Sequence, residues 1–177
     1  MKHLLKLVLF TATLTITGCA QQAPTEPQNF MTNDGKVNIL WQNTNDYTDI
    51  EATIGVQSKF EQYLFTQLTQ ELGKLANKHL TEGQQLDLTV TNVDLAGDVQ
   101  PTFGASVDDI RVVTDLYPPK LDFEYTLSQN GKVIASGTEK LRNMSYLSDL
   151  QPLNNDTFRY EQKLLTEWFK KTIKPLL

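Results

Sequence analysis

The sequence predicts an α+β fold, a two-layer sandwich in which a mixed, mostly antiparallel sheet of four to five strands carries two helices on one face. Several short segments alternate apolar and polar residues, which is the period of a half-buried strand. Two other segments repeat apolar residues every three or four positions, as an amphipathic helix does. The order of strand, helix, several strands and helix lets both helices bury their apolar stripes against one sheet.

The first 18 residues have the pattern of a signal peptide. They contain the bases Lys2 and Lys6, an apolar run over Leu4–Leu14, and a small residue, Gly18, at their end. The apolar run is shorter than the roughly 20 residues that a membrane-spanning helix needs, whereas it matches the hydrophobic part of a secretory signal. We therefore expect residues 1–18 to be removed on export.

The stretch Ile16-Thr17-Gly18-Cys19 resembles a bacterial lipobox, and Cys19 is the only cysteine of the chain. The resemblance implies a thioether-linked diacylglycerol on Cys19, cleavage before it and acylation of the new N-terminus. A thiolate is the nucleophile that accepts the diacylglycerol. Ala20, rather than aspartate, follows the cysteine, which in Gram-negative lipoproteins favours export to the outer membrane. The protein is expected to be anchored there by its lipid, on the periplasmic side.

A flexible tether should join the lipid anchor to one folded domain. Residues 19–33 contain two prolines, several glutamines and few apolar side chains, a composition typical of solvated linkers. Residues 34–177 have the length of a single domain. Without Lys2 and Lys6, the mature chain has 14 basic and 21 acidic residues. This acidic balance argues against nucleic acid as a partner, because nucleic acid requires a concentrated basic face.

The folded domain should begin with a strand and a long helix. A turn signal at Asn33-Asp34-Gly35 precedes residues 37–41, where apolar side chains recur at every second position. From Gln57 the apolar period becomes helical, and the helix should end near residues 78–80. Its apolar stripe consists of Phe60, Leu64, Leu68, Leu72, Leu75 and Ala76. A right-handed crossover through this helix would make the strands on either side of it parallel.

The strand after the helix contains a change of phase. Apolar residues alternate from Leu86 to Val90 and then continue at Val93 and Leu95. One extra residue in a strand turns the side chains that follow it to the other face, so we expect a bulge near Asn92. Residues 96–109 have no clear period and should form a long loop, and a further strand is expected over residues 110–116.

A hairpin should follow, closed by Asn130-Gly131, the strongest signal for a type I′ turn in the chain. A two-residue loop would place Leu127 opposite Ile134 and Asp122 opposite Glu139. Facing like charges are unfavourable, so either a base such as Lys120 or Lys140 relieves them or the register shifts.

The last element should be a helix that starts near residues 155–157 and stops at Pro175. One side of it is apolar and should pack on the sheet. The residues on that side are Leu164, Leu165, Trp168, Phe169 and Ile173.

Four segments resemble the successive signatures of the domain of unknown function 3016 family, which consists of small exported proteins of Gram-negative bacteria. These segments are WQNTNDYTDI (41–50), VTNVDLAGDVQP (90–101), DIRVVTDLYPPKLDFEY (109–125) and RYEQKLLTEWFKK (159–171). The resemblance covers nearly all of the mature chain. It implies no activity and brings no catalytic or binding residue with it.

The residue types of the mature chain exclude several kinds of catalyst. His79 is its only histidine, and lipidation of Cys19 leaves no free thiol. A Cys–His nucleophile pair is therefore excluded, and a zinc site would have only one imidazole. His79 should lie at the end of the first helix, where a cationic side chain favours the helix dipole. No cofactor and no catalytic residue is predicted.

Five aspartates lie close together in the sequence, with an arginine among them. They are Asp94, Asp98, Asp108, Asp109 and Asp115, and the arginine is Arg111. Clustered carboxylates suit a calcium site, for which Asp94, Asp98 and Asp115 are the candidates, or paired-carboxylate catalysis. The alternative is that Asp94 and Asp98 form turns while Asp109 or Asp115 pairs with Arg111.

The loop Gly97–Asp109, with Phe103 near its tip, is the predicted contact surface, because irregular segments on a rigid scaffold tend to carry recognition. The sequence thus predicts a non-enzymatic lipoprotein that binds another envelope protein, besides its lipid contact with the membrane. The residues expected to take part are Asp94, Asp98, Phe103, Asp108, Asp109 and Arg111. A hydrolase or a divalent-cation-binding protein is the alternative, and three or more aspartates converging in a pocket would favour it.

Overall fold

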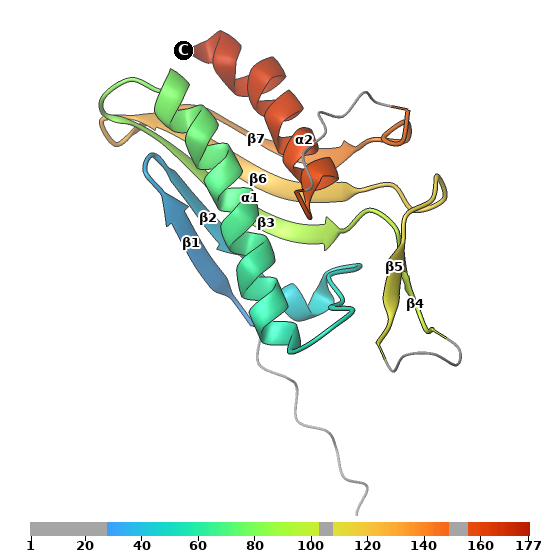
Figure 1. Cartoon of the computed structure of the whole chain (residues 1–177). Helices are drawn as coiled ribbons and strands as arrows, with labels where there is room; N and C mark the ends of the chain where they lie inside the picture. The colour runs from blue at the N-terminus through green and yellow to red at the C-terminus, as the bar shows by residue number, and fades with distance from the viewer. Residues whose placement is uncertain (1–27, 103–107, 149–155) are drawn as a thin grey trace, which may run out of the picture.

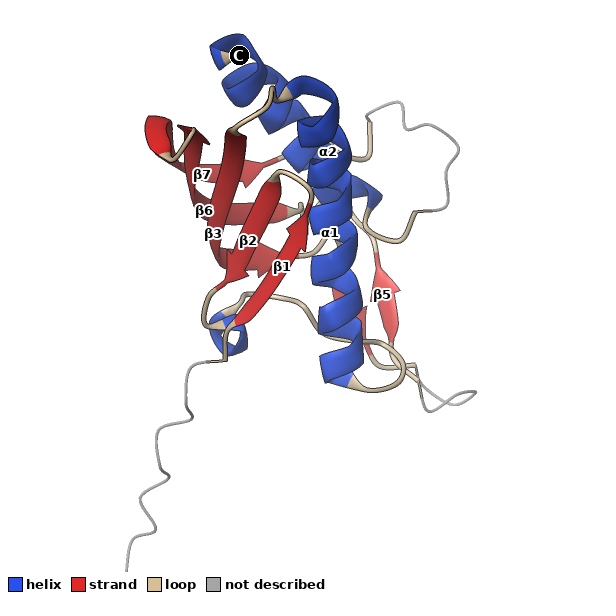
Figure 2. Ribbon diagram, turned by 90° about the vertical axis from the view of Figure 1, so that its left-hand side faces the viewer, coloured by secondary structure: helices blue, strands red, loops and turns tan. Residues whose placement is uncertain are grey.

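The computed structural model of the chain describes residues 28–102, 108–148 and 156–177. The main sheet has the strand order β1-β2-β3-β6-β7. Its strands are β1 (Phe30–Asp34), β2 (Val37–Trp41), β3 (Gln84–Asp94), β6 (Lys120–Gln129) and β7 (Lys132–Arg142). Two helices, α1 (Gln57–His79) and α2 (Arg159–Trp168), lie on the same face of this sheet (Figures 1 and 2). The predicted α+β class and the two-layer arrangement are therefore confirmed.

The core lies between the sheet and the two helices. The predicted stripe of α1 is buried at Leu64, Leu68, Leu72 and Ala76, which belong to the same core as the inward side chains of β2 and β3. Trp41 of β2 stacks on Phe65 of α1 with 4.4 Å between the ring centroids. Such a pair adds stabilisation beyond the area that it buries.

The predicted apolar side of the last helix is also buried, at Leu164, Leu165 and Trp168 and in the following turn, Phe169–Ile173. Trp168 meets the ring of Phe123 edge-on, with the centroids 4.8 Å apart. None of the helices among the described residues combines the length and the apolar character that crossing a membrane requires.

The central strands have the predicted direction and the predicted bulge. Strands β2 and β3 are parallel and are joined through α1. The pairing of β3 with β6 shifts between Val90 and Asn92, so Val90 and Val93 both face the core. Because of the bulge, the apolar residues before it and those after it point to the same face of the sheet.

The predicted hairpin register is correct next to the turn, at Gln129–Lys132 and Ser128–Val133, and shifts by one residue beyond it, which is one of the two expected ways to relieve the repulsion at Asp122. Ile134 is an extra residue in β7, because Ser128 pairs with Val133 and Leu127 with Ala135. The shift places Asp122 opposite Lys140 instead of Glu139. It thereby replaces a repulsive cross-strand pair with an attractive one. The turn itself has positive φ angles at Asn130 and Gly131, 50° and 76°, as a type I′ turn requires.

The ordered domain begins earlier than expected, because residues 30–33 of the predicted tether belong to β1. Phe30 contacts the ring of Phe65, with 5.6 Å between centroids. The Thr32 hydroxyl lies 2.6 Å from the Thr69 hydroxyl and accepts a hydrogen bond of 2.8 Å from Nε1 of Trp41. These long-range contacts hold a strand that local composition does not predict. Residues 1–27, which include the signal peptide, Cys19 and most of the tether, lie outside the described residues.

The segment predicted to be a long loop contains a strand. Strand β4 (Asp98–Gln100) pairs with β5 (Ile110–Val112) in a second, two-stranded sheet, which we call the ribbon. The ribbon lies beyond the end of β3 (Figure 1). Strand β5 is shorter than expected, since the chain turns where the Tyr117 N–H donates to the Thr114 carbonyl. Phe103, between the two strands, lies outside the described residues.

Candidate functional site

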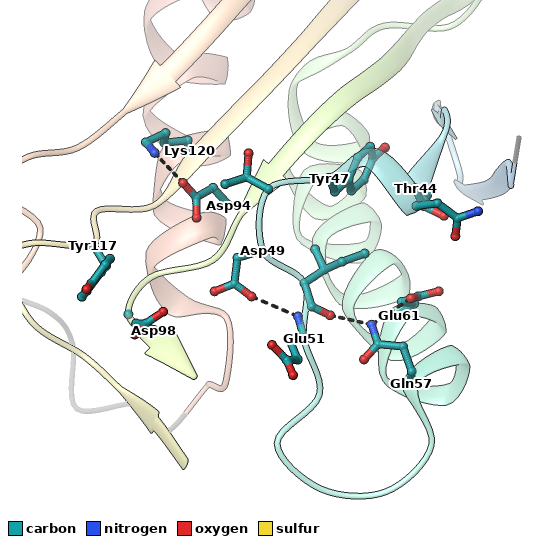
Figure 3. A pocket seen from close by; sticks show the side chains of 14 residues that line it. Thr44, Tyr47, Asp49, Glu51, Gln57, Glu61, Asp94, Asp98, Tyr117 and Lys120 are labelled. Atoms are coloured by element: carbon teal, nitrogen blue, oxygen red, sulfur yellow. Dashed lines mark hydrogen bonds and ion pairs between the residues drawn. The ribbon is translucent and has the colours of Figure 1, made fainter. Parts of the chain in front are cut away.

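A cleft of about 640 Å³ opens at the carboxyl ends of the parallel strands β2 and β3. Its walls are the segment after β2, the first turns of α1, and the residues that follow β3 and precede β6 (Figure 3). The lining residues are Thr44, Asn45, Tyr47, Thr48, Asp49, Ile50, Glu51, Gln57, Glu61, Asp94, Gly97, Asp98, Tyr117 and Lys120. In sheets with parallel strands, ligands commonly bind at this end.

The segment after β2 is held against the end of β3. The Asp49 N–H donates to the Val93 carbonyl at 3.2 Å, and the Leu95 N–H donates to the Asp49 carbonyl at 3.0 Å. The Tyr47 hydroxyl donates to the Val90 carbonyl at 2.8 Å. Burial raises the pKa of Tyr47, so this phenol stays neutral and acts as a structural donor. These bonds extend the parallel pairing past β2 and fix one wall of the cleft.

Arg111 of β5 ties the ribbon to this wall. Its guanidinium donates two hydrogen bonds to the Asp49 carboxylate, of 2.6 and 2.9 Å, and one of 3.0 Å to the Glu51 carbonyl. The prediction that Asp109 or Asp115 pairs with Arg111 is therefore wrong. The true partner lies 62 residues away in the sequence, where only the tertiary structure brings it into reach.

The five clustered aspartates do not converge. Asp94 and Asp98 line the cleft, whereas Asp108, Asp109 and Asp115 do not. Asp94 forms an ion pair with Lys120, its cross-strand partner on β6 (Figure 3). Asp108 and Asp115 are exposed. The structure thus brings together two of the predicted carboxylates, one of which is already neutralised by a base.

The three candidate calcium ligands, Asp94, Asp98 and Asp115, do not share one site, since Asp115 does not line the cleft. Across residues 28–102, 108–148 and 156–177, no three carboxylate, histidine or cysteine side chains are grouped so that they could hold a metal ion. His79 lies at the end of α1, as expected, and its ring is 5.9 Å from that of Phe169.

We expect millimolar calcium to leave the melting temperature of the protein unchanged, because a cation that binds only the folded state would raise it. Differential scanning fluorimetry after chelator treatment measures this directly. A rise that Asp94→Asn and Asp98→Asn abolish would instead establish a calcium site at these residues.

The cleft carries more carboxylates than bases. Besides Asp49 and Asp94, which are paired, it is lined by Glu51, Glu61 and Asp98. Among the described residues, none of these last three forms an ion pair. Glu61 is mostly buried and accepts a 2.8 Å hydrogen bond from Nε2 of Gln57. Three carboxylates without a base therefore face one cleft, which favours a ligand with positive charge.

The residues of the first wall were not among those predicted from the sequence. Asp49, Glu51 and Glu61 are far in the sequence from the clustered aspartates at 94–115. One available signal was their position: they follow a strand predicted to be parallel to its neighbour, and such strand ends are common ligand sites.

A second, smaller pocket of about 140 Å³ adjoins the cleft and shares Glu51 with it. It is lined by Glu51, Thr53, Phe60, Leu95, Ala96, Arg111, Val113, Thr157, Phe158, Tyr160 and Glu161. Glu161 of α2 is 2% exposed, and its Oε1 accepts a 2.7 Å hydrogen bond from the Ala96 N–H. Burial raises the pKa of this carboxyl, against the smaller opposing effects of the Ala96 amide and of Arg111.

Glu161 was not predicted as a site residue, although the sequence contains a signal for it. Glu161 precedes Leu164, Leu165 and Trp168 by three, four and seven positions. This spacing places its carboxyl on the apolar side of the last helix. A charged residue on a buried face is uncommon unless it has a specific partner or role.

Comparison with known proteins connects this architecture to one family. The model of a family described as protein of unknown function, DUF3016, matches residues 35–171, which include both helices' buried faces, the cleft and the ribbon. No curated protein and no solved structure matches the chain. Because the family model covers most of the sequence, the chain belongs to the DUF3016 family of proteins of unknown function.

Proposed function

We propose that this protein is a lipoprotein anchored through Cys19 to the outer membrane, on its periplasmic side, and that its domain is a non-enzymatic module that binds a basic segment of another envelope protein. The observation that carries the proposal is the cleft, where Glu51, Glu61 and Asp98 face the same space without a basic partner among the described residues. The lipid anchor is supported by the lipobox-like stretch that ends in Cys19.

The cleft suits binding better than the alternative of a hydrolase or a cation-binding protein. Asp94 forms an ion pair with Lys120, and Asp49 forms one with Arg111. The aspartates expected to act together in the alternative are separated, and only Asp94 and Asp98 line the cleft. A paired-carboxylate mechanism needs two carboxyl groups at a defined separation on either side of a substrate, which the paired Asp94 does not offer.

The rim of the cleft also has the composition of a contact surface. Ile54 and Val56 are 69% and 57% exposed on the loop that joins Glu51 to α1, and Tyr117 is 41% exposed on the opposite wall. Figure 3 shows this loop and Tyr117 on the two sides of the cleft. Protein interfaces combine aromatic and apolar contacts with a polar rim, and complementary charge selects the partner.

Site-specific photo-crosslinking in intact cells tests the proposal. A crosslinking residue at Asn45, which is exposed and lines the cleft, should capture a protein that contains a lysine- and arginine-rich segment. The matched control is Thr138 of β7, which is exposed and pairs with Glu124 on the side of the sheet that faces away from the helices. It should not capture that protein.

Neutralising the cleft by Glu51→Gln together with Asp98→Asn should weaken this capture about two- to thirtyfold, since an exposed charge contact contributes about 0.2–1 kcal/mol. Equal capture from Asn45 and Thr138 would contradict the proposal. So would capture that the double variant leaves unchanged.

A further inference from the structure

The small pocket beside the cleft has apolar walls and one buried carboxyl. Its walls come from both helices and from the chain after β3 and β5, and include Phe60, Leu95, Val113 and Phe158. Its volume of about 140 Å³ is close to that of a cavity of roughly 150 Å³ that admits a benzene ring. The pocket is therefore large enough for a side chain of five or six heavy atoms.

The charge inside this pocket is not balanced. Arg111 lines it, but its guanidinium is engaged by both oxygens of Asp49 and by the Glu51 carbonyl. Arg111 and Asp49 thus form a neutral pair. Within the part of the chain that the structure describes, the Glu161 carboxyl accepts one hydrogen bond from another residue, that from the Ala96 N–H. The second acid that lines the pocket is Glu51. Burial disfavours the ionised form of such a carboxyl unless a cation pairs with it, and no base among the described residues forms an ion pair with Glu161.

We propose that this pocket binds an alkylammonium group, namely the side chain of a lysine in the basic partner segment. The inference rests on the proposed function for the source of the lysine. Its methylenes pack against Phe60, Val113 and Phe158, and its ammonium donates to the Glu161 carboxylate. The pocket serves as the anchor point of the interface, and the cleft receives the flanking residues of the segment.

Lysine fits this chemistry better than arginine. An ammonium is compact and carries three donors on a stem of four methylenes, whereas a guanidinium is a planar group with five donors. The pocket offers one buried carboxyl and mostly apolar walls, which would leave several guanidinium donors unpaired. A bound ammonium would also lower the pKa that burial raises, because a nearby cation favours the ionised form of Glu161.

The position of the pocket lets one polypeptide occupy both sites. Glu51 lines the pocket and the cleft alike. Arg111, on the pocket side, is bound to Asp49, which lines the cleft. A segment that lies in the cleft would therefore pass the Arg111–Asp49 pair to place one lysine against Glu161. Its other bases would remain beside Asp98 and Glu61.

Nuclear magnetic resonance of the full-length protein in detergent micelles tests the inference, with the Ala96 amide as the reporter because it donates to Glu161. Butylammonium should shift this resonance saturably and bind about tenfold or more tighter than 1-butanol, since hydrogen bonds to charged groups contribute about 1.5–3 kcal/mol. Lowering the pH should weaken butylammonium binding, because the raised pKa of Glu161 lets it protonate before ordinary carboxyl groups.

Two variants separate the roles of charge and space. Glu161→Gln keeps the shape and an acceptor for Ala96, and it should remove the preference for butylammonium over butanol. Val113→Trp, at an exposed position that lines the pocket, should block both compounds. Equal binding of the two compounds to the unmodified protein would overturn the inference, as would an unchanged preference in Glu161→Gln.

A lysine capped at both ends as an amide distinguishes a polypeptide from a free amine. It should shift the Ala96 resonance as butylammonium does. If butylammonium binds and the capped lysine does not, the assignment to lysine is wrong. The proposed function is judged separately by capture at Asn45. If capture persists and butylammonium does not bind, the pocket assignment is wrong while the proposed function stands.

Discussion

Cys19→Ser is expected to abolish incorporation of labelled palmitate into the protein and to leave the precursor uncleaved before residue 19. The reason is chemical, because a serine hydroxyl is not ionised at neutral pH and cannot replace the thiolate that accepts the diacylglycerol. Metabolic labelling and the mass of the accumulated protein measure the two effects. Normal labelling and processing in the variant would contradict the lipid anchor.

Ala20→Asp is the matched comparison for the destination of the anchored protein. Because an aspartate after the lipidated cysteine disfavours export to the outer membrane in Gram-negative lipoproteins, the variant should keep its palmitate and move to the inner-membrane fraction. Separation of the two membranes on a density gradient distinguishes these fates. An unmodified protein that already fractionates with the inner membrane would contradict the proposed outer-membrane location.

Phe65→Ala is expected to lower the free energy of unfolding by about 3–5 kcal/mol, the usual cost of removing a fully buried aromatic ring. Phe65 is 0% exposed. Its ring stacks on that of Trp41 and also contacts the rings of Phe30 and Tyr47. The substitution therefore loosens β1, β2 and the wall of the cleft together. Denaturant unfolding followed by tryptophan fluorescence measures the loss.

Gln62→Ala is the control on the same helix, since Gln62 is exposed and surface substitutions usually change stability by less than about 0.5 kcal/mol. A loss below about 1 kcal/mol in Phe65→Ala would show that the ring is not central to the core. Partial unfolding near the cleft should also reduce capture at Asn45, which connects this stability measurement to the proposed function.

Much of the fold could be predicted because its signals are local. The period of α1, the alternation along β6 and the phase change at Asn92 are each contained in a few consecutive residues. The apolar side chains of one face must all be buried together, so the pattern determines which face of each element turns to the core. The parallel pairing of β2 and β3 follows from the crossover through α1.

The misplaced elements depend on contacts between distant residues. Strand β1 is held by Phe65 and Thr69 of α1, although its own composition is that of a linker. Strand β4 has three residues, too few for a period to show. The hairpin register follows from the placement of one extra residue, Ile134, which exchanges a repulsion at Asp122 for an attraction.

The candidate site was predictable only in part for the same reason. Asp94 and Asp98 could be found because they lie at a predicted strand end. Their surroundings could not, since Lys120 occupies Asp94 through the sheet register and Asp49 reaches Arg111 across 62 residues. The carboxylates that stay without a base in the cleft are identified only when these pairs are known.

The sequence by itself determined the two-layer α+β architecture and the family, because periodicity and short motifs are properties of neighbouring residues. It also predicts the lipid anchor at Cys19. Only the tertiary structure decided which charges are neutralised and which remain available. Electrostatic pairing depends on distance in space, and the fold brings Asp49, Arg111 and the buried Glu161 to one end of the sheet from three distant parts of the chain.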